Sequence, residues 1–161
     1  MRYHLCCGKK HLSGWVNVDR EKFGQEVVAD INREWKFIPH GSADHILIED
    51  GLEHVHSLED FFHNASASLA EKGILEIRVP HFKNPSAYRV THKHFFSYSF
   101  FRIFPEAHDA TQDLIPYKIE LIVHNKFPLS LLNILANCIP NLWERIAYVS
   151  GLHVWMRKEG K

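Results

Sequence analysis

The spacing of five short apolar segments constrains the fold of this chain more than any other feature of its sequence. Runs rich in Val, Ile and Leu, with little alternation of polar residues, are typical of strands covered on both faces, as in a parallel sheet. The segments are Tyr3–Cys7, Trp15–Asp19, Glu26–Asp30, His45–Glu49 and Ile74–Val79. The sequence therefore predicts an α/β fold with a mostly parallel sheet. We expect a single domain, because 161 residues suit one hydrophobic core.

The strongest helix pattern lies between the fourth and fifth segments. Ser57 suits the N-cap position, with Asp60 three residues later, and apolar residues then recur at steps of three and four. The helix is predicted to end near Lys72 and Gly73, because a cation followed by a glycine is typical of a helix C-terminus. With its flanking segments, it forms a strand–helix–strand unit.

After Pro80 the pattern changes, and the chain is expected to complete the sheet with antiparallel strands. We predict that residues 118–124 and 152–157 pair as a hairpin at the sheet edge. The other expected elements are a long polar loop over 81–94, a helix over 97–104, and one or two helices over 129–149, broken at Pro140. The apolar segment 129–149 is expected to be core, the face of a homo-oligomer, or a lipid-docking surface.

Charge and cysteine content narrow the classes of partner and compartment. Nineteen Lys and Arg balance nineteen Asp and Glu, so the chain has no overall field that would attract nucleic acid. Cys6 and Cys7 are adjacent, where an ordinary disulfide is strained, and no zinc-type cysteine spacing occurs. The chain opens without a charged leader, and its apolar stretch over 127–139 is shorter than the roughly 20 residues of a membrane span. We expect a reduced, cytoplasmic protein with no integral membrane segment and no nucleic-acid partner.

A glycine turn and two acidic strand ends form the pattern that carries chemistry. Gly8 follows the first strand, where a glycine lets the backbone approach a ligand. Asp19 ends the second strand, where a carboxylate can accept both hydroxyls of a ribose, and Asp30 ends the third. This order is typical of a nucleotide-like ligand held over the carboxyl ends of a parallel sheet. The alternative is that both aspartates only cap the turns after their strands.

Four segments in order resemble the class I S-adenosylmethionine-dependent methyltransferases, particularly small members whose first motif reads Leu-x-Cys-Gly and then Gly-Trp-x-Asn-x-Asp. The segments are LCCGKKHLSGWVNVD at 5–19, ADINREWKFIPHGSADHILIEDGLEH at 29–54, LAEKGILEIRVP at 69–80 and HKHFFSYSF at 92–100. The resemblance implies a Rossmann-like sheet, S-adenosyl-L-methionine as cofactor, and methyl transfer to an unidentified small-molecule or sugar-like acceptor.

The same resemblance assigns nine residues to the cofactor pocket. They are Cys6, Cys7 and Gly8 around the methionine part, Asp19 at the ribose hydroxyls, Asp30 and Ile31 at the adenine, and Glu49, Asp50 and Gly51 closing the pocket.

Two departures from the family pattern favour an alternative function. The family usually has a glycine where this chain has Cys6, and only residues 9–14 separate the turn from the second strand. A parallel crossover normally needs about a dozen residues and a helix, so we expect the first helix to be missing or reduced. The N-terminal helix that often covers the cofactor is also not expected. The alternative is a catalytically inactive, methyltransferase-like binding module.

Histidines near the predicted strand ends are the candidate catalytic residues. Glu53 and His54 follow the fourth strand, where many methyltransferases meet their substrate. In the loop after the fifth strand, His92 and His94 would lie on one side of an extended segment. We assign His54, His92 and His94 as candidate bases for the acceptor's proton. Together with His81, the loop histidines could instead bind Zn²⁺, as in a metal-dependent hydrolase, or be ordinary surface residues; we assign no metal site here.

Overall fold

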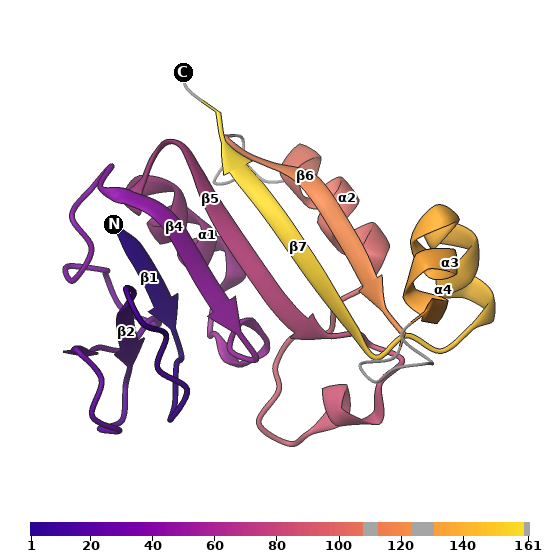
Figure 1. Cartoon of the computed structure of the whole chain (residues 1–161), viewed down its shortest axis with the longest axis horizontal. Coiled ribbons are helices and arrows are strands. Elements are labelled where there is room, and N and C mark those ends of the chain that lie inside the picture. The colour runs from indigo at the N-terminus through magenta and orange to yellow at the C-terminus, as the bar shows by residue number, and fades with distance from the viewer. Residues whose placement is uncertain (108–112, 124–130, 160–161) are drawn as a thin grey trace.

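The computed structural model describes residues 1–107, 113–123 and 131–159, and within them a seven-stranded sheet in the order β3-β2-β1-β4-β5-β7-β6 (Figure 1). The strands are β1 (Arg2–Leu5), β2 (Val16–Asp19), β3 (Val27–Val28), β4 (Ala43–Glu49), β5 (Leu69–Pro80), β6 (Leu114–Ile122) and β7 (Gly151–Lys158). Strands β1 to β5 pair in parallel. Strand β7 is antiparallel to both β5 and β6. The predicted mostly parallel sheet with an antiparallel edge hairpin is confirmed.

Helix α1 (Leu58–Ser68) begins as predicted and ends earlier than predicted. The Ser57 hydroxyl accepts a hydrogen bond from the Asp60 backbone N–H at 3.1 Å, which confirms the N-cap. The predicted end near Lys72 and Gly73 is wrong, because β5 already begins at Leu69. A Cβ on Gly73 would lie 2.8 Å from the carbonyl oxygen of Ala43. This glycine therefore permits close pairing of β5 with β4 and does not cap a helix.

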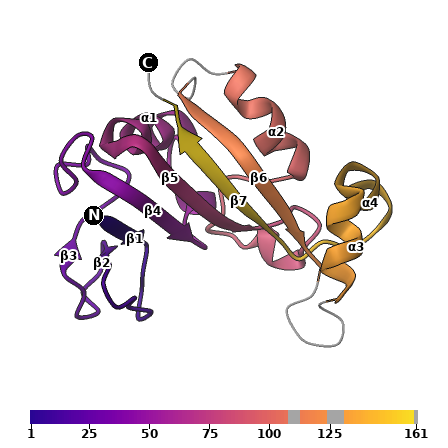
Figure 2. The same cartoon turned by 45° about the horizontal axis from the view of Figure 1, so that its top comes forward.

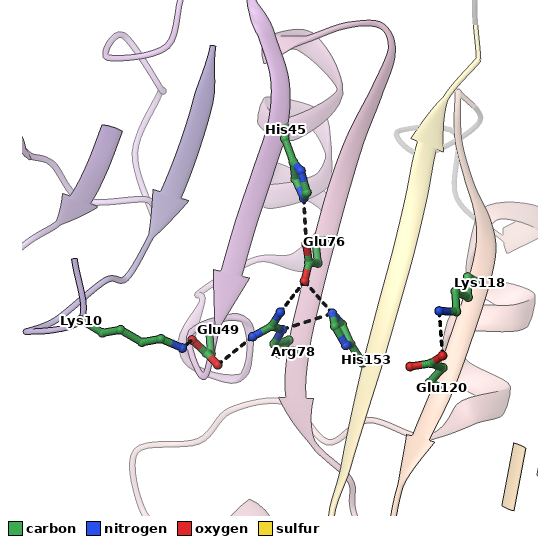
Figure 3. Close-up of polar contacts among 8 residues, drawn as sticks. All are labelled: Lys10, His45, Glu49, Glu76, Arg78, Lys118, Glu120 and His153. Atoms are coloured by element: carbon green, nitrogen blue, oxygen red, sulfur yellow. Dashed lines mark hydrogen bonds and ion pairs between the residues drawn. The ribbon is translucent and has the colours of Figure 1, made fainter. Parts of the chain in front are cut away.

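Helices α1 and α2 (Tyr98–Ala107) both lie on one face of the sheet (Figures 1 and 2). In β5, the buried Leu75, Ile77 and Val79 alternate with Glu76 and Arg78. Figure 3 shows the latter two on the face of the sheet opposite these helices. The prediction that both faces are covered is therefore wrong for the described residues, since one face carries no helix and is polar.

The connection between β1 and β2 contains no helix in the described structure, as expected from its length. Asn17 holds this connection in place from within β2. Its Oδ1 accepts from the Leu12 backbone N–H at 2.8 Å, and its Nδ2 donates to the Leu12 carbonyl at 3.2 Å and to Glu26 Oε2 at 3.0 Å. The buried side chain of Asn17 thus fixes the connection between β1 and β2, in which a crossover helix is missing.

The loop after β5, helix α2 and strand β6 are all of the predicted types, but their boundaries differ from the predicted ones. Helix α2 continues three residues beyond the predicted end at Phe104. Strand β6 begins at Leu114, four residues before the predicted Lys118, with a register irregularity between Pro116 and Lys118. The predicted end of that strand at residue 124 lies outside the described residues. The loop over 81–94 contains one short 3₁₀ helix, η2 (Pro85–Tyr88).

Helices α3 (Leu132–Cys138) and α4 (Pro140–Ile146) meet at the predicted break at Pro140; residues 129 and 130 of the predicted segment lie outside the described ones. Asn137 of α3 accepts from the Leu121 N–H at 2.8 Å and donates to its carbonyl at 3.0 Å, so it covers the edge of β6. Most apolar side chains here are exposed, which contradicts a core role: Leu131, Ile134, Leu135, Ile139, Leu142 and Ile146. No described helix is long and apolar enough to span a bilayer.

Candidate functional site

The turn after β1 has the backbone conformation that a glycine-rich ligand turn requires. Cys6 and Gly8 both lie in the left-handed region, with φ of 54° and 51°. A Cβ on Gly8 would meet no atom within 4 Å, so the space beside this residue is open. The Cys7 N–H donates to the Val18 carbonyl at 3.1 Å and ties the turn to β2.

Asp19, at the end of β2, lies against this turn. Its Oδ2 accepts from the Gly8 N–H at 2.9 Å, and its Oδ1 accepts from the Glu21 N–H at 3.0 Å. Each carboxylate oxygen has a second lone pair, so both can still accept from a ligand hydroxyl. The structure thus brings together the predicted turn and the predicted ribose-binding carboxylate.

The Cys6 side chain is packed between the ends of β1 and β4. A Cβ on the buried Gly51 would lie 2.8 Å from the Cys6 sulfur. Burial raises the pKa of the Cys6 thiol to about 12, and the nearby carboxylate of Asp19 adds to this effect. The thiol is therefore neutral at physiological pH and acts as a packing group. Cys7 is buried, whereas Cys6 is half-buried.

Asp30 holds a turn beside the predicted adenine position. Its Oδ1 accepts from the backbone N–H and the side-chain amide of Asn32, each at 3.0 Å. The backbone hydrogen bond from Asn32 lowers the pKa of Asp30. Asn32 in turn accepts from the His56 N–H at 2.7 Å, and Ile31 is buried. Asp30 therefore caps the turn after β3, which is the role expected of it if it binds no ligand. Its contact with adenine stays a prediction.

A polar pocket of about 510 Å³ lies where β4 and β5 end and β7 begins. Two residues predicted to close the cofactor pocket line it. Glu49 is ion-paired with both Lys10 and Arg78, and Asp50 ends β4 in the left-handed region with φ of 49°. The polar side chains that line this pocket are Glu49, Asp50, Arg78, Asn84, Ser86, Ser150 and His153. Such a lining suits a hydroxyl-rich small molecule.

Beside this edge, Glu53 and His54 of the 3₁₀ helix η1 (Leu52–His54) meet His92 from the loop after β5. One ligand atom from each of the three residues lies within 4.8 Å of the other two. Glu53 is 1% exposed, and its Oε2 has no hydrogen-bond partner. Burial raises the pKa of Glu53 to about 7, with a smaller contribution from the negative charge of Asp50. We name these three residues the Glu–His–His cluster.

The two imidazoles of the cluster are held in defined orientations. The ring centroids of His54 and His92 are 4.6 Å apart in an edge-to-face arrangement. His54 Nδ1 lies 3.1 Å from the Thr91 carbonyl oxygen, and His92 Nδ1 lies 2.9 Å from that of Ala87. A carbonyl can only accept, so Nδ1 carries a proton in both rings, and Nε2 is the nitrogen that has a lone pair in the neutral form of each ring. Burial and then His54 lower the pKa of His92.

The other two loop histidines belong to different surroundings. His81 is fully buried, with its Nε2 2.7 Å from Glu144 Oε1 in α4, so it is not a surface residue. His94 Nε2 lies 2.9 Å from the Val55 carbonyl oxygen. In the part of the chain that the structure describes, the Glu–His–His cluster is the one group of three such side chains with donor atoms within 4.8 Å of one another. The zinc alternative built on His81, His92 and His94 has no support in this arrangement.

A charged network that was not predicted from the sequence lies on the helix-free face of the sheet (Figure 3). Glu76 accepts from His153 at 2.6 Å, Arg78 at 2.7 Å and His45 at 2.8 Å. Burial opposes ionisation of Glu76, but the hydrogen bonds from these three residues outweigh it and hold its pKa well below the usual range. The alternation of Glu76 and Arg78 with aliphatic residues in β5 was the signal that could have revealed this face.

Comparison with known proteins defines the fold but not a family. No family model matches the chain, and no curated protein matches its sequence. A SAM-dependent methyltransferase from Archaeoglobus fulgidus is similar with a TM-score of 0.64 at 16% identity, over 98% of this chain and 85% of that one. An S-adenosylmethionine-dependent methyltransferase from Mesorhizobium loti is similar with a TM-score of 0.66 at 12% identity, over 98% of this chain and 90% of that one. Geranyl diphosphate C-methyltransferase from Streptomyces coelicolor is similar with a TM-score of 0.58 at 11% identity, over 98% of this chain and 69% of that one. The chain has the Rossmann-like fold of S-adenosylmethionine-dependent methyltransferases.

Proposed function

We propose that this chain binds S-adenosyl-L-methionine beside the turn after β1 and transfers a methyl group to a small, polar acceptor. The juxtaposition of Asp19 with the open side of Gly8 supports the proposal most strongly. A carboxylate placed 2.9 Å from a glycine N–H, with free space beside that glycine, suits a ligand that carries a ribose. Bound cofactor would supply an electrophilic methyl group on a sulfonium sulfur.

The residues around the turn would have different tasks in holding the cofactor. The carboxylate of Asp19 would accept the ribose hydroxyls, and the turn of Cys6, Cys7 and Gly8 would wall the methionine part. Asp30 and Ile31 would flank the adenine, and Glu49 to Gly51 would close the pocket from β4. Because the Cys6 thiol packs on Gly51, it joins the two sides of this pocket.

The acceptor would bind in the polar pocket at the ends of β4 and β5, and its proton would be received nearby. With Nδ1 directed at a backbone carbonyl, His54 and His92 each leave Nε2 as the possible proton acceptor, which makes them the proposed bases. His94, the third candidate base, is hydrogen-bonded through Nε2 to the Val55 carbonyl. Methyl transfer is an in-line displacement, so alignment of the acceptor supplies much of the rate. A general base contributes typically 10²- to 10⁴-fold.

A panel of hydroxyl- and amine-bearing small molecules, incubated with the protein and methyl-labelled cofactor, tests the proposal. We expect label transfer to a polar acceptor, and His54→Asn or His92→Asn should lower turnover by about 10²-fold while the cofactor Kd stays unchanged. The matched control is His63→Asn, an exposed residue of α1. Cofactor binding without transfer to any acceptor would instead support the inactive binding module.

A further inference from the structure

The Glu–His–His cluster offers three metal-binding donors from two separate parts of the chain. One ligand atom from each of Glu53, His54 and His92 lies within 4.8 Å of the other two. Around a tetrahedral ion with ligands at about 2.0–2.2 Å, donor atoms are roughly 3.3 Å apart. Donor atoms within 4.8 Å of one another would therefore have to approach by up to about 1.5 Å to bind the same ion. We propose that the cluster binds a divalent transition-metal ion of the zinc type.

The carboxylate of Glu53 supplies the first independent argument. Its side chain is buried, and its Oε2 has no hydrogen-bond partner. A buried polar atom without a partner is costly, so folded proteins nearly always satisfy such atoms with protein, water or an ion. A cation at the cluster would supply the partner that Oε2 lacks.

The orientation of the two imidazoles supplies the second argument. Histidines that bind metals usually donate their other ring N–H to a carbonyl or carboxylate, which fixes the ring and its tautomer. His54 and His92 do this through Nδ1, to the carbonyls of Thr91 and Ala87. In the neutral form of each ring Nε2 is then the nitrogen with a lone pair, which is the atom that can bind a metal. Two neighbouring histidines without a shared ligand would not require both of these Nδ1–carbonyl contacts.

Two imidazole nitrogens and one carboxylate oxygen are the donor set of many catalytic zinc sites, which keep a further position open. The negative charge of Asp50 acts on both Glu53 and His92 and would attract a cation, whereas the positive charge of Arg89 acts on the same two residues and opposes it. A catalytic role for the ion rests on the proposed function: an acceptor hydroxyl in the open position would lose its proton more readily. In that case the two histidines would act through the ion and not as free bases. Metal binding itself does not depend on methyl transfer.

Calorimetry of the chelator-treated full chain with Zn²⁺, in the absence of cofactor and acceptor, tests the site. We expect one ion per chain, and a higher Tm in the presence of Zn²⁺. Glu53→Gln and His92→Asn should each lower the Zn²⁺ affinity by more than about 100-fold. His92→Cys, which keeps a ligand at this position, should retain much of the affinity.

The control for the other histidines is His63→Asn, which should leave Zn²⁺ binding unchanged. Equal Zn²⁺ affinity in wild type and in folded Glu53→Gln would overturn the proposal, as would a Tm of the wild type that Zn²⁺ does not change. Loss of affinity in His63→Asn to the same extent would show binding elsewhere and would also overturn it. Cofactor binding is measured separately, so failure of the metal site and failure of the proposed function are distinguishable.

Discussion

The Cys6 thiol packs directly on Gly51, so that a Cβ at position 51 would lie 2.8 Å from its sulfur. This contact joins the turn after β1 to the end of β4, the two sides of the proposed cofactor pocket. It also accounts for a cysteine where a glycine is usual. The backbone of Cys6 has the left-handed φ of 54° that a glycine would adopt, and its side chain fills the space that Gly51 leaves free.

Gly51→Ala should therefore destabilise the chain and weaken cofactor binding. The new methyl group would meet the sulfur and Cβ of Cys6, and overpacking of this kind typically costs about 1–3 kcal/mol. The double variant Cys6→Gly with Gly51→Ala should recover part of that loss, because both contacting atoms of residue 6 are then gone. Chemical unfolding of the single and double variants measures the coupling. Additive losses in the double variant would show that the contact is unimportant.

The helix-free face predicts a specific dependence of stability on pH. Because the pKa of Glu76 is lower in the folded than in the unfolded chain, its stabilisation is fully present above about pH 4.3 and is lost as the pH falls. Glu76→Gln should lower the free energy of unfolding at pH 7 by about 2–4 kcal/mol, since it removes the negative charge and places an NH2 donor where one of the two acceptor oxygens meets His45, Arg78 and His153.

Urea unfolding of both proteins between pH 3 and 7 checks this prediction. The free energy of unfolding of the wild type should exceed that of Glu76→Gln by less and less as the pH falls below about 4. Glu120→Gln is the matched control: it breaks an exposed ion pair with Lys118 on the same face and should cost less than about 1 kcal/mol. A difference in the free energy of unfolding between wild type and Glu76→Gln that does not change with pH would contradict this role of Glu76.

Because α3 and α4 expose apolar side chains, we still predict that copies of the chain associate through these helices. Ile134→Glu combined with Ile146→Glu should shift the chain toward monomer, because both side chains are more than 60% exposed and would be buried at such an interface. The control is Ile103→Glu, on the exposed side of α2. Sedimentation velocity over a range of protein concentrations separates the cases. A wild type that stays monomeric throughout would exclude this interface.

Local patterns in the sequence predicted much of the fold. The Ser57 cap depends on contacts close in sequence, and the missing first helix depends on the length of a connection. The covered and uncovered faces were not predicted, because segments such as Ile74–Val79 contain only two polar residues. Those residues, Glu76 and Arg78, occupy alternate positions, and this period of two distinguishes a one-sided strand from a fully buried one.

The candidate site was predicted residue by residue but not as an arrangement. His54 and His92 are 38 positions apart, and only the path of the loop after β5 brings their rings together. Nothing local in the sequence separates His92 from the buried His81, which pairs with Glu144 of α4. The carboxylate of Asp19 is different, because its position at a strand end fixes its place beside the turn.

Titration calorimetry with S-adenosyl-L-methionine on the wild type and on Asp19→Ala is the most direct test of the account. We predict saturable binding of one cofactor per chain, weakened in the variant by about 1.5–3 kcal/mol, or roughly ten- to a hundred-fold in Kd, since charge-assisted hydrogen bonds to the ribose are lost. Asp44→Ala, an exposed aspartate in β4, should bind like the wild type, and thermal unfolding verifies that each variant is folded. No binding to the wild type, or an equal Kd in folded Asp19→Ala, would contradict a cofactor site at this turn.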